Sequence, residues 1–168
     1  MVLPLIDLLM LALLVICLIT DLRSRKIYNP VVLVFIVVGL VYHLVDEGWA
    51  GVLFSLQGLA VGMLLLIIPF VMGKMGAGDV KLLGAVGALQ GPAFVFHAFL
   101  ASAIAGGVLA VITLARKRMA ARVLQTLGFS FIYRVPLSGW ESGVYIPYGV
   151  AVFVGTLAYY FLGWHLQW

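Results

Sequence analysis

The chain has 168 residues, of which 65% are hydrophobic and only 10% are charged, and its mean hydropathy is +1.22. These values exclude an ordinary soluble domain and indicate a protein of the lipid bilayer. Ten basic and six acidic residues give a net charge of +4. The basic residues fall in alternate gaps between apolar runs, so the charge reports membrane topology and does not indicate a nucleic-acid partner.

Charged and turn-forming residues divide the chain into six apolar runs, and we interpret each run as a membrane-spanning helix. The runs are residues 2–20, 30–45, 49–72, 80–89, 93–115 and 146–164. The first run lacks a basic leader and a small-residue cleavage site, so it is interpreted as a retained helix and not as a secretory signal. The fourth run is short, because a helix of about eleven residues rises only roughly 16 Å. Its first residue is therefore expected within reach of water.

The gaps between the runs alternate in charge. Basic gaps lie at 21–29, 73–81 and 116–143, whereas the gaps at 46–51 and 90–92 are acidic or uncharged. The positive-inside rule places the basic gaps in the cytoplasm, and both termini are then on the outer side.

Two further patterns concern packing and the membrane surface. In the last basic gap, Met119, Val123 and Leu127 recur at helical spacing opposite basic residues, which predicts an amphipathic helix on the cytoplasmic surface. Glycines four residues apart, at 58 and 62 and at 87 and 91, predict close approach of helices. The sequence thus predicts an all-α polytopic membrane protein in which residues 1–168 form a single domain.

The acidic residues single out one candidate site, because a charged side chain deep in a bilayer costs ~2.5 to 3.5 kcal/mol and needs a reason. Three of the six fall in a turn or in a cytoplasmic gap, and Asp7 lies near the outer end of the first run, where we expect a structural or interfacial role. Asp21 and Asp79 remain. The first helix descends to Asp21 and the fourth rises from Asp79, so both carboxylates reach one depth at the cytoplasmic face. Gly76 and Gly78 permit a sharp turn and close approach just before Asp79.

Such a pair can perform acid–base chemistry. Two carboxylates about 4 Å apart repel by ~4 kcal/mol at an effective dielectric of 20, which corresponds to about three pKa units. They therefore share one proton, and one acts as base and the other as acid. Asp79, at a helix N-terminus, is the expected ionised base. The residues alone leave alternatives open: Asp79 as an N-cap, Asp21 as a loop residue, and Lys81 as a neutralising partner or a topology marker.

The segments "GAGDVKLLGAVG" and "DLRSRKIYNP" together resemble the type IV prepilin peptidases, which are membrane aspartic proteases with a Gly-x-Gly-Asp motif and a second aspartate after the first retained helix. The resemblance spans the whole chain. It implies that Asp21 and Asp79 are the catalytic aspartates, and that Gly76, Gly78 and Lys81 support the site.

The segment "IPYG" at 146–149 also resembles a motif that opens the last helix of that family, and this implies supporting roles for Pro147, Tyr148 and Gly149. The chain departs from the family in reading Ile-Tyr-Asn-Pro where Ile-Pro-Asn is common. With Cys17 as its single cysteine it lacks the zinc-binding Cys-x-x-Cys pairs of the larger bifunctional members. It therefore resembles the short, peptidase-only members that serve tight-adherence or Flp-type pili, and neither methyltransferase activity nor a metal or other cofactor is implied.

The implied substrate is a prepilin-like precursor with a short basic leader and a long apolar helix, cut at the cytoplasmic surface of a prokaryotic inner membrane. Two other readings stay open. The chain could be a small transporter or a non-enzymatic pilus-assembly subunit that uses Asp21 and Asp79 as cation or proton sites, with His43 and His97 as candidate relays. It could also be a presenilin-like protease that cuts within the bilayer, although the Pro-Ala-Leu element of that family does not occur.

Overall fold

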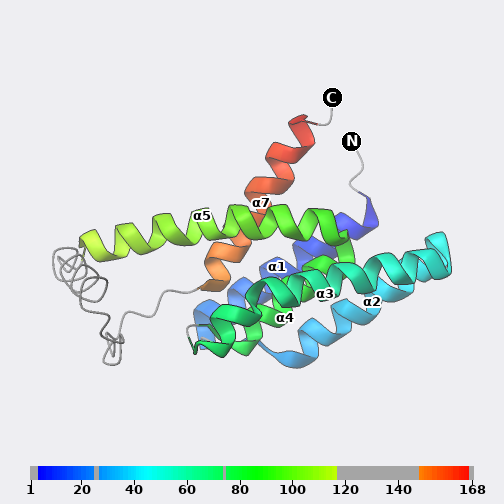
Figure 1. Ribbon diagram of the computed structural model, residues 1–168, viewed down its shortest axis with the longest axis horizontal. Helices are drawn as coiled ribbons and strands as arrows, with labels where there is room; N and C mark the ends of the chain where they lie inside the picture. Colours follow the sequence, from blue (N-terminus) through cyan, green and yellow to red (C-terminus); the bar gives the residue numbers. More distant parts are fainter. Residues whose placement is uncertain (1–3, 25–26, 74, 117–147, 167–168) are drawn as a thin grey trace.

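The computed structural model describes residues 4–24, 27–73, 75–116 and 148–166. Within these ranges the chain is helical apart from short connections and forms no strand, which confirms the all-α prediction (Figure 1). The helices are α1 (Leu5–Ser24), α2 (Asn29–Glu47), α3 (Trp49–Val71), α4 (Ala77–Gln90), α5 (Pro92–Arg116) and α7 (Tyr148–Leu166). The expected amphipathic surface helix and Pro147 lie outside the described residues.

Several of these helices have the length and composition of membrane spans. Among the described residues, four segments are long and apolar enough to cross a bilayer: Leu5–Ser24, Asn29–Glu47, Trp49–Val71 and Pro92–Leu109. These segments indicate a multi-pass membrane protein. The apolar stretch of α7 is shorter, and α4 has only 14 residues. A six-span topology therefore stays a prediction.

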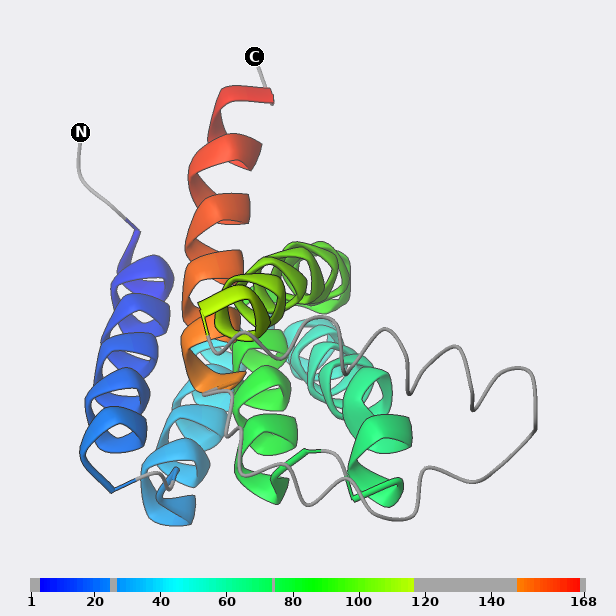
Figure 2. The same cartoon turned by 90° about the vertical axis from the view of Figure 1, so that its left-hand side faces the viewer.

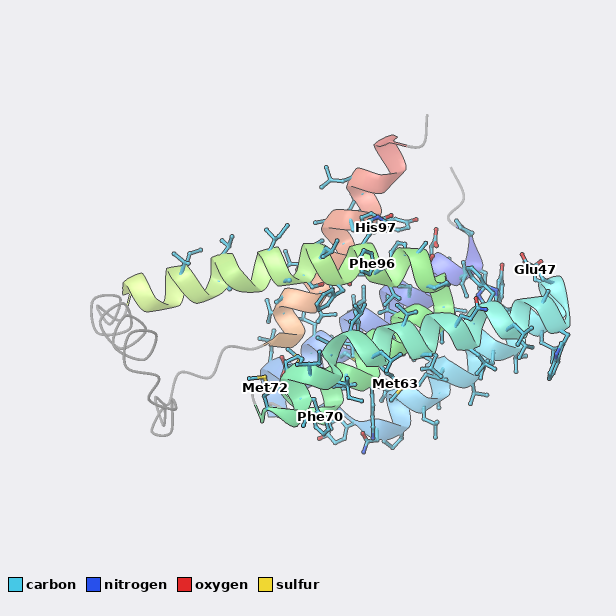
Figure 3. All side chains as sticks on the ribbon, in the orientation of Figure 1. Glu47, Met63, Phe70, Met72, Phe96 and His97 are labelled. Carbon is cyan, nitrogen blue, oxygen red and sulfur yellow. The ribbon has the colours of Figure 1, made fainter. Side chains whose placement is uncertain are left out.

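Large apolar side chains lie on the outside of the bundle, as a surface in contact with lipid requires. Met63 and Phe70 of α3 and Phe96 of α5 are all more than a third exposed (Figure 3). In a soluble domain, exposed apolar surface of this extent would mark an interaction site or an aggregation hazard. In a bilayer these side chains contact lipid chains instead of water, so their exposure is expected.

Contacts between helix ends fix the directions of α2, α3 and α4. The start of α2 meets the start of α4, where Lys81 contacts Asn29, and their ends meet where His43 contacts Leu89. The two helices therefore run the same way. Only Gly48, at φ +64°, separates α2 from α3, and α3 turns back along the bundle (Figures 1 and 2).

The closest helix contact is between α3 and α4. A Cβ atom added at Gly58 would overlap the backbone carbonyl of Gly87, and one added at Gly87 would overlap the carbonyl of Gly58. Gly62 lies in the same way against the backbone of Leu83. The predicted close approach at the spaced glycines is thus confirmed, and two backbones touch where any side chain would separate them.

The short helix α4 ends inside the bundle, and its last carbonyl groups find partners there. The Ser55 hydroxyl donates to the carbonyl oxygen of Ala88 at 2.7 Å, and the Nε2 N–H of His43 donates to that of Leu89 at 2.9 Å. Carbonyls at a helix end that lack intrahelical partners are costly in hydrocarbon. Both donors are buried, so His43 is a helix-capping residue of the core.

Candidate active site

Asp21 lies in the last part of α1 and is only 4% exposed. The helix continues to Ser24, three residues beyond Asp21, where the first helix was expected to end. The first turn of α7 packs directly on this carboxylate, because a Cβ atom at Gly149 would lie 2.6 Å from Asp21 Oδ2. The N-terminal end of a helix favours negative charge. Asp21 is therefore held against the positive end of α7.

Asp79 is the third residue of α4, which begins at Ala77. Its backbone N–H donates to the carbonyl oxygen of Gly76 at 3.2 Å, and the backbone N–H of Gly76 donates in return to the Asp79 carboxylate. This reciprocal bonding resembles a capping box, in which the third helical residue reaches back to the N-cap. The N-cap is Gly76. The alternative of Asp79 as an N-cap is therefore wrong.

The two aspartates are electrostatic neighbours. Asp79 precedes the apolar run of α4 and lies outside the four candidate spans. Burial raises the pKa of Asp79 to about 6, the negative charge of Asp21 acts in the same direction, and the hydrogen bond from Gly76 opposes both. Since α1 also contacts α4 directly, the structure brings together the carboxylates that the sequence pairs.

The two motif glycines differ in how much space surrounds them. A Cβ atom at Gly78 would lie 2.9 Å from the Cβ of Ile27, so a side chain there would push away the connection between α1 and α2. At Gly76 the nearest atom is Asp79 Oδ2 at 3.4 Å, which is an ordinary contact. Gly78 therefore makes the close approach that the sequence predicted.

Lys81 lies two residues after Asp79 in α4, at the junction with α2. Its ammonium group donates to Asn29 Oδ1 at 3.2 Å. Both residues line a groove of about 490 Å³ whose other walls are apolar side chains of α2 and α3, including Leu33 and Met63. Lys81 thus holds the start of α4 against α2, beside a hydrophobic groove. The side chain of Tyr148, at the first position of α7, lies outside the described residues.

A second polar cluster lies at the other end of α1, and the sequence reasoning missed it. Asp7 is 6% exposed. Its Oδ1 accepts a hydrogen bond from Gln90 Nε2 at 2.7 Å, and its Oδ2 accepts one from the Tyr160 hydroxyl, also at 2.7 Å. Asp7 is therefore a buried link between three helices. In the part of the chain that the structure describes, no group of three His, Cys, Asp or Glu side chains is arranged to hold a metal.

The fold and the site together define an apolar helical membrane protein with two interacting carboxylates at one end. Comparison with protein families makes this specific. The chain belongs to the type IV leader peptidase family, whose model matches residues 8–111. The match includes both Asp21 and Asp79 and ends within α5. Comparison with curated proteins and with solved structures finds no match.

Proposed function

We propose that the chain is an aspartic endopeptidase in which Asp21 and Asp79 activate water to remove the leader of prepilin-like precursors. The observation that carries the proposal is the electrostatic interaction of these carboxylates at one end of the bundle, although they are 58 residues apart in the sequence. Membership of a leader peptidase family supports the same activity and the same class of substrate.

The surroundings of the two carboxylates suggest different roles for them. The first turn of α7 packs on Asp21, whereas burial and the charge of Asp21 favour a protonated Asp79. The sequence predicts Asp79 as the ionised base. We assign the roles the other way, because the raised pKa of Asp79 suits an acid and leaves Asp21 as the base.

In this scheme Asp21 accepts a proton from water as the water oxygen attacks the scissile carbonyl carbon. Asp79 donates its proton to the carbonyl oxygen, and a tetrahedral gem-diol forms. Its collapse returns a proton from one hydroxyl to Asp79, while Asp21 delivers its proton to the leaving amine. The pair ends with one proton, as it began, so its titration belongs to both groups together.

We place this end of the bundle at the cytoplasmic surface. Arg23 and Lys81 lie near the aspartates, whereas Asp46 and Glu47 lie at the opposite end of α2. The positive-inside rule then orients the bundle with the aspartates inward. A precursor whose apolar helix lies in the same bilayer would present its leader junction at this depth, and this positioning supplies much of the rate.

The packing between the two ends of α1 argues against a transporter. Met10, Leu13 and Leu14 lie between Asp7 and Asp21 and are at most 1% exposed. A conducted proton or cation needs a continuous series of polar groups or waters. In the described part of α1, the buried face is apolar for about two turns. His43 caps α4, so it is occupied by a structural contact.

The test is co-expression of the chain with small precursor proteins of the same genome that carry a basic leader. In Asp21→Asn and Asp79→Asn we expect kcat for leader removal to fall by about 100- to 10,000-fold, the usual contribution of acid–base catalysis. Asp46→Asn is the matched control, since Asp46 is exposed at the far end of α2. Maturation of the precursor at the normal rate by either site variant would exclude the mechanism, and a cut within the apolar helix would favour a presenilin-like protease.

A further inference from the structure

The Asp7 cluster, defined as Asp7, Gln90 and Tyr160, joins one residue from each of α1, α4 and α7. The same three helices supply Asp21, Asp79 and Gly149 at the other end of the bundle. Each pair among these helices is in contact along the way, and Figure 2 shows them side by side. The bundle therefore has two polar ends on one set of helices.

The spacing within each helix aligns the two ends. Asp7 and Asp21 are 14 residues apart, which is close to four helical turns, so both project from one face of α1. Asp79 and Gln90 are 11 residues apart, as are Gly149 and Tyr160, and 11 residues is close to three turns. In each of these three helices, the residue at the Asp21 end and the residue of the Asp7 cluster therefore lie on the same face.

Only apolar packing lies between the two ends along α1 and α4. Met10, Leu13 and Leu14 of α1 are buried together with Leu83 and Val86 of α4. Apolar contacts are non-directional, and lipid chains compete with them equally well, so they specify the axial position of a helix weakly. Two 2.7 Å hydrogen bonds to the two oxygens of one carboxylate specify it strongly.

We infer that Asp7 is a positioning residue, and that the Asp7 cluster sets the register of α1 against α4 and α7 at which Asp21 meets Asp79. The inference rests on the proposed role of the two aspartates. A shift of one helix by about 1 Å at the reacting groups can cost on the order of 100-fold in rate. Asp7 acts through this register and touches no reacting atom.

Comparison of Asp7→Leu with Asp7→Asn distinguishes an effect of helix register from an effect of the Asp7 charge. Leucine removes both hydrogen bonds. Asparagine keeps an acceptor for Tyr160 and offers an amide donor to Gln90, whose own amide can turn to accept it. With purified enzyme and a precursor that the wild type processes, we expect Asp7→Leu to lower kcat by about 10- to 100-fold with KM within about twofold. Asp7→Asn should keep at least roughly a third of the wild-type kcat, because the link is preserved.

A second pair of variants covers the case in which Asp7→Leu does not accumulate in the membrane. Tyr160→Phe removes one hydroxyl and one hydrogen bond. Tyr159→Phe makes the same change one residue away, on a ring that stacks against His97. We expect Tyr160→Phe to lower kcat by about 3- to 10-fold, the equivalent of one ordinary hydrogen bond, and Tyr159→Phe to leave it unchanged.

The results distinguish the inference from the function on which it rests. Wild-type kcat in Asp7→Leu, or equal kcat in Tyr160→Phe and Tyr159→Phe, would overturn the inference. Equal losses in Asp7→Asn and Asp7→Leu would overturn it as well, because charge and not register would then matter. Asp21→Asn and Asp79→Asn are assayed in parallel. If they cut normally the proposed function fails, and if they are inactive while the Asp7 variants are normal, only the inference fails.

Discussion

At Asp79, the structure combines two causes that raise a carboxyl pKa and one that lowers it. Burial has the largest effect, the charge of Asp21 adds to it, and the backbone N–H of Gly76 opposes both, with a pKa of about 6 as the result. A carboxyl group with this pKa keeps its proton to a much higher pH than an exposed aspartate does. It can therefore act as the acid while its neighbour acts as the base.

Removal of the Asp21 charge should lower the pKa of Asp79, and this can be measured directly. In Asp21→Asn we expect a pKa below about 6 that stays above 3.8, because the contribution of burial remains. The chain contains only four aspartates, so carboxyl-labelled aspartate gives an NMR titration with few signals. Asp46→Asn should leave the Asp79 titration unchanged. An Asp79 pKa that is the same with and without Asp21 would mean that the two groups do not interact.

The same pKa sets the sign of the pH dependence of activity. Asp79 must carry a proton to donate it, so kcat/KM of the wild type should fall as pH rises through the pKa of Asp79. An activity that rises across this range would indicate that Asp79 acts in its ionised form.

At the scale of elements, the site is assembled by helix ends: the last turn of α1 and the first turns of α4 and α7. Each first turn brings the positive end of a helix dipole. The absence of a side chain at Gly149 allows α7 to approach Asp21, and the absence of one at Gly78 allows Ile27 to approach α4. Glycine is needed at these two positions because of packing and not because of an unusual backbone angle.

Gly149→Ala tests this contact. Its Cβ would lie 2.6 Å from Asp21 Oδ2, so either the carboxylate or α7 must move. We expect kcat for leader removal to fall by about 10- to 100-fold, the effect of a small displacement of a reacting group. Gly107→Ala is the matched control, because no atom lies within 4 Å of a Cβ added there. Equal rates in the two variants would show that α7 does not constrain Asp21.

These helix ends also show how far sequence reasoning reaches. The apolar runs predicted all six observed helices, and the alternation of their directions paired Asp21 with Asp79. The start of α4 was placed too late, because glycines resemble a turn and helix first turns tolerate them. The Asp7 cluster and the cap from His43 could not be predicted, since each depends on how helices distant in sequence pack. The spacing of 14 and 11 residues between polar positions was the available signal.

At the scale of the whole molecule, the helices run up and down, and this brings polar residues together at two opposite ends, the Asp7 cluster and the paired aspartates. The hydrogen bond from Tyr160 places the start of α1 and the end of α7 together, at the end opposite the paired aspartates. Met63, Phe70 and Phe96 face outward along the sides. An apolar belt between two polar ends is the form expected of a protein that spans a bilayer.

Cysteine accessibility tests the proposed orientation. Cys17 is the single cysteine of the chain, so a Cys17→Ala background leaves no native thiol. Ser24→Cys and Asp46→Cys then place single thiols at exposed positions at opposite ends of the bundle. In intact cells, a membrane-impermeant maleimide should label Asp46→Cys, and it should label Ser24→Cys only after the membrane is opened. The reverse pattern would place the aspartates on the outer side.

The buried apolar stretch of α1 between Asp7 and Asp21 has one more consequence. An enzyme that admits water to carboxylates inside an energised membrane risks short-circuiting the ion gradients across it. Met10, Leu13 and Leu14 place closely packed hydrocarbon between the two ends of α1, and such packing offers no polar path to ions or hydrated protons. The proposed hydrolysis at the Asp21 end is therefore compatible with an intact membrane potential.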